Sequence, residues 1–129
     1  MAGYVTDIER QTLENEYFRE VLFTGPHSQL VVMSLRPGEE IGMETHADVD
    51  QFIRFEAGKG KVVLNGREQA VEDGSAVVIP AGTEHNVVNT SASEALKLYS
   101  IYTPPEHPDG TVHKTKAEAE EYERKHHGR

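Results

Sequence analysis

Short runs of apolar and β-branched residues alternate along this chain with turns rich in glycine, proline and asparagine. Apolar positions that recur every second residue are typical of strands with one buried face. Closely spaced short strands of this kind predict an all-β fold, either a sandwich or a barrel. The segments that we expect to form strands are 17–24, 29–35, a run that begins at Gln51, 61–64, 67–71, 76–79, 85–89 and 96–103.

The two ends of the chain depart from this alternation. Residues 1–15 are polar and acidic, and we expect either a frayed arm or a strand donated to a partner subunit. The barrel itself is then expected to occupy residues 16–104. No repeat or linker divides this stretch, so we interpret it as one domain.

The C-terminal segment, residues 105–129, is expected to form a loop and a short α-helix. Pro104–Pro105 ends the last strand, because proline cannot donate a ladder hydrogen bond. Thr115 and Glu118 have the spacing of a capping box, which predicts a helix over 116–125.

Composition narrows the classes of partner. The chain has 129 residues, enough for one core, and a formal net charge of −9. That charge argues against binding to nucleic acid or to anionic membranes, which both require a basic surface. There is no cysteine, so thiolate ligands and disulfides are excluded. No signal-peptide pattern or bilayer-length apolar run is visible, and we expect a cytoplasmic protein.

Four polar residues are placed where they can meet. Glu44 and His46 are separated by one residue, so on an extended segment they point to the same side. Gln51 begins the next apolar run after a short turn. His85 begins another run, just past the turn at 80–82. Two imidazoles, a carboxylate and an amide at one point suit a divalent metal ion with an open coordination position.

These residues lie in two motifs that resemble the paired motifs of the cupin superfamily. The second motif, G-x5-P-x-G-x2-H-x3-N, is matched at every position, by Gly74, Pro80, Gly82, His85 and Asn89. The first, G-x5-H-x-H-x(3,4)-E-x6-G, keeps its spacing from Gly38 to Gly58. Glu44 stands in place of its first histidine and Gln51 in place of its glutamate.

The resemblance is to small single-domain cupins of the cupin 2 conserved barrel type, often described as similar to mannose-6-phosphate isomerase. It implies a double-stranded β-helix, or jelly-roll, barrel with a metal site inside. The expected ligands are Glu44, His46 and His85, with Gln51 either as a fourth ligand or as the holder of a bound water. The expected cofactor is one divalent ion: Fe, Mn, Zn, Ni or Co. The alternative is a hydrogen-bonded polar core without an ion.

Three function classes remain open. The first is a metal-dependent, isomerase-like enzyme for a small carbonyl or sugar compound, in which Glu44 is the candidate base. Against it, no cationic cluster for a phosphate is visible among the inward positions. The second is an Fe- or Mn-dependent dioxygenase, which the two-His-one-carboxylate set also fits. The third is a non-catalytic barrel that binds a sugar or other small ligand, for which the uncharged Gln51 is mild support.

The alternation of side chains along a strand predicts which of the remaining polar residues face the site. Tyr99 and Tyr102 have opposite parity, and an exposed Lys97 would place Tyr102 inward, where its hydroxyl could transfer a proton. We expect His27 and His113 at the surface in loops.

His107, in the E-H-P-D-G loop, is expected either at the surface or in a lid over the barrel mouth. The outward apolar residues Phe52 and Ile101, together with the N-terminal arm, predict a homodimer.

Overall fold

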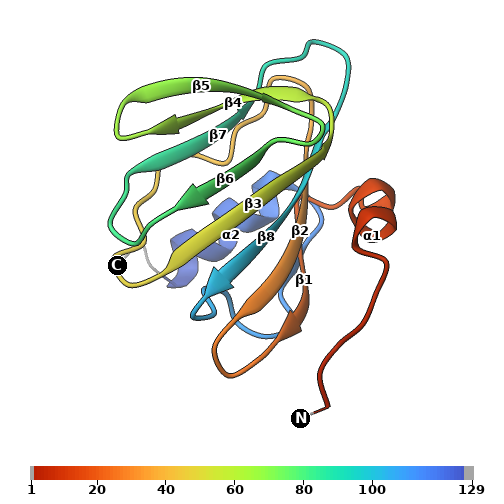
Figure 1. The fold of residues 1–129 in the computed structure, drawn as a ribbon, viewed down its shortest axis with the longest axis vertical. Helices are drawn as coiled ribbons and strands as arrows, with labels where there is room; N and C mark the ends of the chain where they lie inside the picture. The colour runs from red at the N-terminus through yellow and green to blue at the C-terminus, as the bar shows by residue number, and fades with distance from the viewer. Residues whose placement is uncertain (1, 127–129) are drawn as a thin grey trace.

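Two antiparallel sheets face each other in the computed structural model, which describes residues 2–126 (Figure 1). The larger sheet has the strand order β6-β3-β8-β2-β1-β9, and the smaller sheet has the order β5-β4-β7. The elements are α1 (Ile8–Glu14), β1 (Arg19–Thr24), β2 (Gln29–Leu35), β3 (Asp50–Ala57), β4 (Lys59–Leu64), β5 (Arg67–Glu72), β6 (Ala76–Ile79), β7 (His85–Asn89), β8 (Leu96–Thr103), β9 (Val112–His113) and α2 (Lys116–His126).

Every strand expected from the apolar pattern is present, and the predicted strand parity is confirmed. On β3, the side chains of Gln51, Ile53 and Phe55 are buried, whereas those of Phe52 and Arg54 are partly exposed. The inner faces of the two sheets form one continuous apolar core, and each large side chain fully buried there contributes about 1.5–3 kcal/mol.

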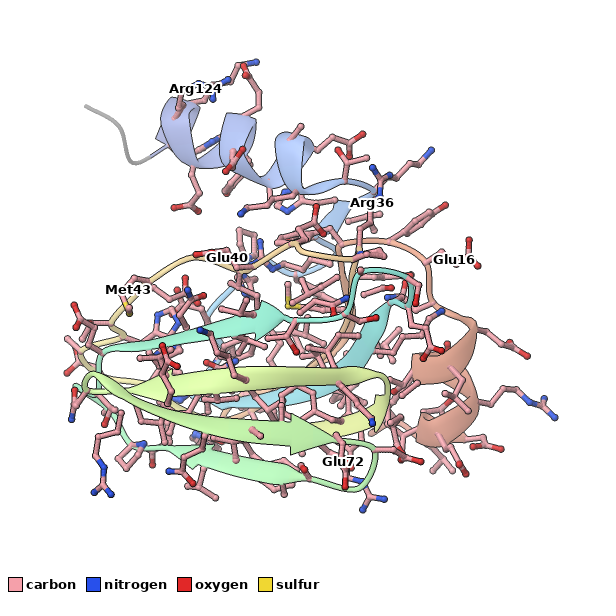
Figure 2. The ribbon with its side chains drawn as sticks, turned by 90° about the horizontal axis from the view of Figure 1, so that it is seen from above. Glu16, Arg36, Glu40, Met43, Glu72 and Arg124 are labelled. Carbon is pink, nitrogen blue, oxygen red and sulfur yellow. The ribbon has the colours of Figure 1, made fainter. Side chains whose placement is uncertain are left out.

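The C-terminal helix begins as the capping box predicts. The Thr115 hydroxyl accepts the Glu118 N–H at 3.1 Å, as in a capping box, whereas the Glu118 carboxylate accepts the N–H of Lys114, one residue before Thr115, at 2.8 Å. In the view of Figure 2, the segment that carries Glu40 and Met43 runs between α2 and β7. Helix α2 therefore lies on the side of the barrel where this segment passes.

The two sequence motifs are joined by backbone hydrogen bonds along the free edge of β7. Glu44 and His85 form a reciprocal pair, in which each N–H donates to the other's carbonyl at 2.9 Å. The Ile41 N–H donates to the Val87 carbonyl, also at 2.9 Å. Directly opposite residues of such a pair present their side chains on the same face. Glu44 is thus placed beside His85 by an isolated bridge, outside any of the named strands.

The N-terminal segment differs from the expectation, because residues 8–14 form helix α1 and not a frayed arm or a donated strand. Asp7 caps the helix by accepting the Arg10 N–H at 3.1 Å. At the other end, the Lys97 ammonium donates to the carbonyls of Leu13 and Asn15 at 2.8 Å each. Lys97 was expected to be exposed; it is partly buried because it binds the C-terminal end of this helix.

The second difference is strand β9, which was expected to be loop. Its backbone pairs with the outer edge of β1, opposite Arg19 and Glu20. His113 is therefore only 8% exposed, and the expectation that it lies at the surface was wrong. Its ring packs against Tyr122 of α2, with the ring centroids 5.4 Å apart. His27 is exposed, as expected.

Several expectations stay predictions. These are the division of the chain after residues 15 and 104, and the pairing of two copies. The expected C-terminal segment also includes residues 127–129, which lie outside the described residues. No helix in residues 2–126 is long and apolar enough to cross a lipid bilayer.

Replacing Gly58 by alanine should destabilise the fold much more than replacing Gly74. Both glycines have a positive φ, +94° and +92°, which any other residue adopts at about 1–2 kcal/mol. A Cβ at Gly58 would also lie 2.4 Å from the Ala95 carbonyl oxygen, whereas a Cβ at Gly74 meets nothing within 4 Å. We expect a loss of about 3 kcal/mol or more for G58A and about 1 kcal/mol for G74A in urea unfolding. Equal losses would contradict the close approach.

Candidate metal centre

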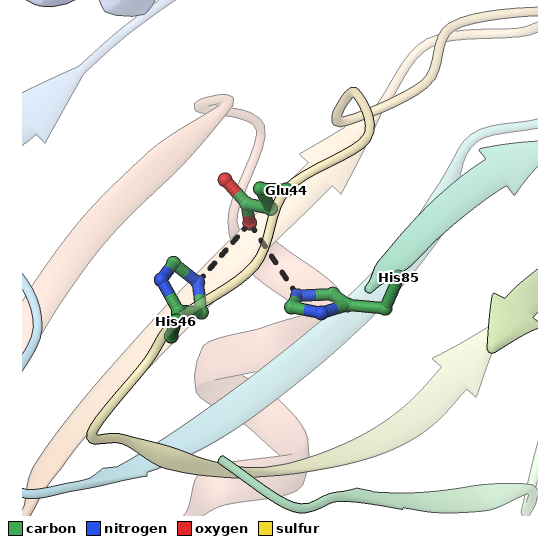
Figure 3. A group of neighbouring side chains, drawn as sticks. All are labelled: Glu44, His46 and His85. Atoms are coloured by element: carbon green, nitrogen blue, oxygen red, sulfur yellow. Dashed lines mark ion pairs between the residues drawn. The ribbon is translucent and has the colours of Figure 1, made fainter. Parts of the chain in front are cut away.

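Three side chains from the two motifs converge on one point in the barrel (Figure 3). Glu44 Oε1 lies 3.4 Å from Nε2 of His46 and 3.7 Å from Nε2 of His85. One ligand atom from each residue lies within 4.8 Å of the others. Glu44 and His46 come from the connection between β2 and β3, and His85 is the first residue of β7. The expected meeting of these three residues is confirmed.

In each histidine, Nε2 faces Glu44 and the second ring nitrogen, Nδ1, contacts another residue that orients the ring. Nδ1 of His85 lies 2.9 Å from the Thr83 carbonyl oxygen, which can only accept, so Nδ1 carries a proton and donates it to this carbonyl. Nδ1 of His46 lies 3.3 Å from Oε2 of Glu106. Both Nε2 atoms are buried and make no hydrogen bond within the described residues. A carbonyl or carboxylate partner on the ring nitrogen that does not bind the metal, here Nδ1, is typical of metal-binding histidines.

The charges of the cluster are strongly coupled. Burial by itself would raise the pKa of Glu44, but the neighbouring imidazoles of His46 and His85 outweigh it and lower that pKa to about 2. The Glu106 carboxylate, followed by Glu44, raises the pKa of His46 to about 9. At neutral pH the metal-free cluster therefore contains an ionised Glu44 and a protonated His46. A bound cation would take the place of that proton.

Gln51 and Tyr102 are joined by a hydrogen bond, and the Tyr102 ring is a neighbour of the His46 ring. Gln51 is 2% exposed, and its Nε2 donates to Ser100 Oγ and to Tyr102 Oη, each at 3.2 Å. Its Oε1 is buried and makes no hydrogen bond within the described residues. A buried amide oxygen of this kind is free to accept a metal ion or a water molecule. Gln51 as a fourth ligand stays a prediction.

Tyr102 faces the interior, as its parity predicted, and is 2% exposed. Its ring lies edge-on to those of His46 and His107, with centroids 6.1 Å and 5.1 Å away. Burial raises the pKa of Tyr102, so its hydroxyl stays protonated and can donate.

A cavity of about 730 Å³ opens beside the cluster, between the barrel and α2. Glu44 and His46 line one side, and residues of α2, among them Ala119 and Glu120, line the other. The apolar part of the wall includes Phe18. This volume is typical of a site for a small molecule.

The E-H-P-D-G loop also borders this cavity, through Glu106 and His107. Buried Gln29 anchors the loop. Its Oε1 accepts both backbone N–H groups, at 3.2 and 3.0 Å, and its Nε2 donates to the His107 carbonyl at 2.7 Å. Burial, together with the charge of Arg19, lowers the pKa of His107 to about 3, so this ring is neutral. The role of the loop as a lid stays a prediction.

Two residues that belong to the site, Glu106 and Arg19, were not identified from the sequence. Glu106 lies in a loop with no strand parity, so nothing in the sequence pointed it at His46. Arg19 lies within an expected strand and shares the parity of Val21, which was an available signal. It lines the cavity and is 7% exposed, so the inward positions do include one cation.

Comparisons with known proteins show that this chain is similar to cupin domains and to several proteins over most of its length. Residues 31–102, which include all three convergent residues, match the sequence profile of the cupin domain. The uncharacterized protein YrkC of Bacillus subtilis is 52% identical over 122 residues, which cover 90% of this chain but only 65% of YrkC. The uncharacterized protein L612 of Acanthamoeba polyphaga mimivirus is 45% identical over 113 residues, covering 84% of this chain and 70% of L612. The crystal structure of BH2720 from Bacillus halodurans superposes with a TM-score of 0.88 at 49% identity, covering 92% of this chain and 93% of that chain.

Stability should fall in mild acid because of His113. Burial, followed by the charge of Arg19, lowers the pKa of His113, while Glu118 and Glu123 of α2 act in the opposite direction. Below about pH 6.5 the unfolded chain therefore binds a proton that the folded chain refuses. Its contribution to stability is complete above that pH and is lost as the pH falls toward the lowered value.

The measurement compares the wild type with the variant H113Q in urea unfolding from pH 5 to pH 9. Relative to the variant, the wild type should lose stability below about pH 6.5, by at most about 1.4 kcal/mol per pH unit. The difference between the two proteins should be constant from about pH 7.5 upward. A difference that grows on the alkaline side would contradict a lowered pKa of His113.

Proposed function

This chain belongs to the cupin domain family, and on that premise we propose that it is a metal-dependent enzyme with isomerase-like chemistry on a small carbonyl or sugar-type compound. The all-β cupin barrel with a short C-terminal helix, which the two motifs predicted, is confirmed, with a short helix also at the N-terminal side. In this proposal Glu44, His46 and His85 hold one divalent ion, and the substrate enters the adjoining cavity.

The observation that carries the proposal is the pair of buried Nε2 atoms, one on each histidine, that have no hydrogen-bond partner within the described residues. Nε2 of His46 and Nε2 of His85 are buried, make no hydrogen bond within the described residues, and face the same carboxylate oxygen. Buried polar atoms of this kind are normally paired or coordinated. A divalent ion that displaces the His46 proton would bind both Nε2 atoms and the carboxylate at once, and the donor set suits Fe, Mn, Zn, Ni or Co.

A bound divalent ion would polarise a carbonyl or hydroxyl oxygen of the substrate. The neutral groups next to the cluster are suited to proton handling. The Tyr102 hydroxyl stays protonated and can donate, while the neutral His107 ring has a buried Nε2 without a hydrogen-bond partner among residues 2–126. The expected role of Glu44 as a base competes with its role as a ligand, because its Oε1 faces both imidazoles.

One observation favours a second candidate, an Fe- or Mn-dependent dioxygenase. Two histidines and one carboxylate are the ligand type of non-haem Fe(II) sites, which keep positions open for O2 and substrate. A non-catalytic barrel that binds a small ligand is the third candidate.

Elemental analysis of the purified protein is the first test. We expect about one equivalent of a divalent metal in the wild type and a loss of most of it in the double variant E44A/H85A, because two of the three charged or imidazole ligands are removed. The matched control is E16A/H27A, which removes the same residue types from exposed positions. The control should keep the wild-type metal content.

The identity of the metal then separates the candidates. Fe or Mn directs the next assay to substrate-dependent O2 uptake, whereas Zn, Ni or Co directs it to exchange of substrate protons with solvent. Absence of metal from the wild type, even after incubation with each ion, would contradict the metal centre and leave a binding barrel with a polar core.

Glu106 should strengthen metal binding through His46. The variant E106Q keeps the size of the side chain but replaces the carboxylate that faces Nδ1 of His46 with an amide. Loss of such a partner typically weakens metal binding about 10- to 100-fold. Competition with a chromogenic chelator measures the affinity.

The control for this variant is E120Q, which removes a carboxylate from the α2 side of the same cavity. It should change the affinity less than about twofold. Equal affinities of E106Q and wild type would show that the His46–Glu106 contact does not support a metal site.

A further inference from the structure

Arg19 is an almost completely buried cation in the wall of the cavity. It lies on β1 with its side chain on the inward face shared by Val21, and it is 7% exposed. Its backbone neighbours across the sheet are Met33 on β2 and His113 on β9. A guanidinium cannot escape the cost of burial by losing its proton, because arginine stays protonated in proteins. A buried charge of this kind requires a counter-ion or several hydrogen bonds.

The described residues supply almost none of these. A guanidinium has five N–H donors, yet the single polar contact of Arg19 is from Nη1 to Nδ1 of His113 at 3.5 Å. Its Nε is buried without a hydrogen-bond partner. None of the carboxylates in residues 2–126 forms an ion pair with it, although the Glu44 carboxylate attracts its charge at longer range. The face of the Phe18 ring lies 5.2 Å away, which orients the group but does not neutralise it.

The position of Arg19 indicates where its counter-ion binds. Arg19 lines the same cavity as Glu44 and His46, so a ligand in that cavity would lie next to the guanidinium and next to two of the three convergent residues. The planar fork of arginine matches two oxygens of one carboxylate or phosphate. The carboxylates that border this cavity outnumber its arginine and lysine side chains, and this disfavours a dianion relative to a monoanion. The carboxylates are those of Glu44, Glu106, Glu120 and Glu123, and the cations are Arg19, Lys116 and Arg124.

We propose that the cavity binds a small organic carboxylate, whose anionic group pairs with Arg19 while its carbonyl or hydroxyl end faces Glu44, His46 and His85. This inference rests on the proposed metal-dependent function and narrows its substrate class. It assigns Arg19 as the residue that selects an acid over the corresponding neutral carbonyl compound.

The test is isothermal titration of metal-loaded protein with pyruvate and with hydroxyacetone, a neutral ketone of similar size. The wild type should bind pyruvate at least about tenfold more tightly than hydroxyacetone. The variant R19M should lose about tenfold to a hundredfold in pyruvate affinity and leave hydroxyacetone binding unchanged. R19K, which keeps the charge but not the fork, should fall between wild type and R19M.

Arg124 provides the matched control. It borders the same cavity, but its side chain is 68% exposed, pairs with Glu121, and lies on the side of α2 that faces away from the strands (Figure 2). R124M should change pyruvate affinity less than about twofold. An effect of R124M as large as that of R19M would show a diffuse attraction of anions and would overturn the assignment.

Stability separates recognition from a structural role. Because Arg19 is buried without a direct ion pair among the described residues, R19M should unfold at the same or a higher urea concentration than the wild type in the absence of ligand. Lower stability with unchanged pyruvate affinity would overturn the proposal. So would tighter binding of inorganic phosphate than of pyruvate, or no measurable binding of pyruvate to metal-loaded wild type.

Failure of the metal centre has a different signature. If the wild type takes up no metal, pyruvate is titrated into the metal-free protein. Weak binding that R19M abolishes would keep Arg19 as a carboxylate site while the proposed metal-dependent function fails. Equal binding by wild type and R19M in metal-free protein would overturn the assignment of Arg19 itself.

Discussion

The reciprocal backbone pair between Glu44 and His85 is the constraint on which the whole site depends. It holds the connection between β2 and β3 against the open edge of β7, and it places a carboxylate and an imidazole side by side. A third contact, from the Gly82 N–H to the His46 carbonyl at 2.8 Å, fixes His46 next to them. Backbone hydrogen bonds thus deliver three side chains to one point without a regular strand at Glu44.

Residues around the three convergent side chains fix the orientation of the two imidazole rings. Thr83 and Glu106 orient the two imidazoles, and buried Gln29 anchors the loop that carries Glu106. In the wall of the same cavity, Arg19 adds a buried positive charge that forms no direct ion pair with a carboxylate among the described residues. A cluster of metal-ligand type and a buried cation facing one cavity describe a site for a small acid, which neither feature indicates alone.

The local parts of the fold could be predicted because their causes are local. Alternating burial along β3 follows from the pleat, so Gln51 inward requires Phe52 outward. The capping box at Thr115 and Glu118 placed the start of α2 for the same reason. Helix α1 was missed because its apolar face is weak. It is held by a cap at Asp7 and by Lys97, a residue more than eighty positions away.

The sequence by itself determined the barrel, its strand parity and three convergent residues, because strand periodicity and motif spacing are encoded within short stretches. The tertiary structure alone decided that Glu106 faces His46 and that Arg19 and His113 share one buried contact across 94 residues. Contacts of this kind depend on which strands become neighbours and on where a loop crosses the barrel mouth. No local pattern specifies either, since both arise only when the two sheets close on a common core.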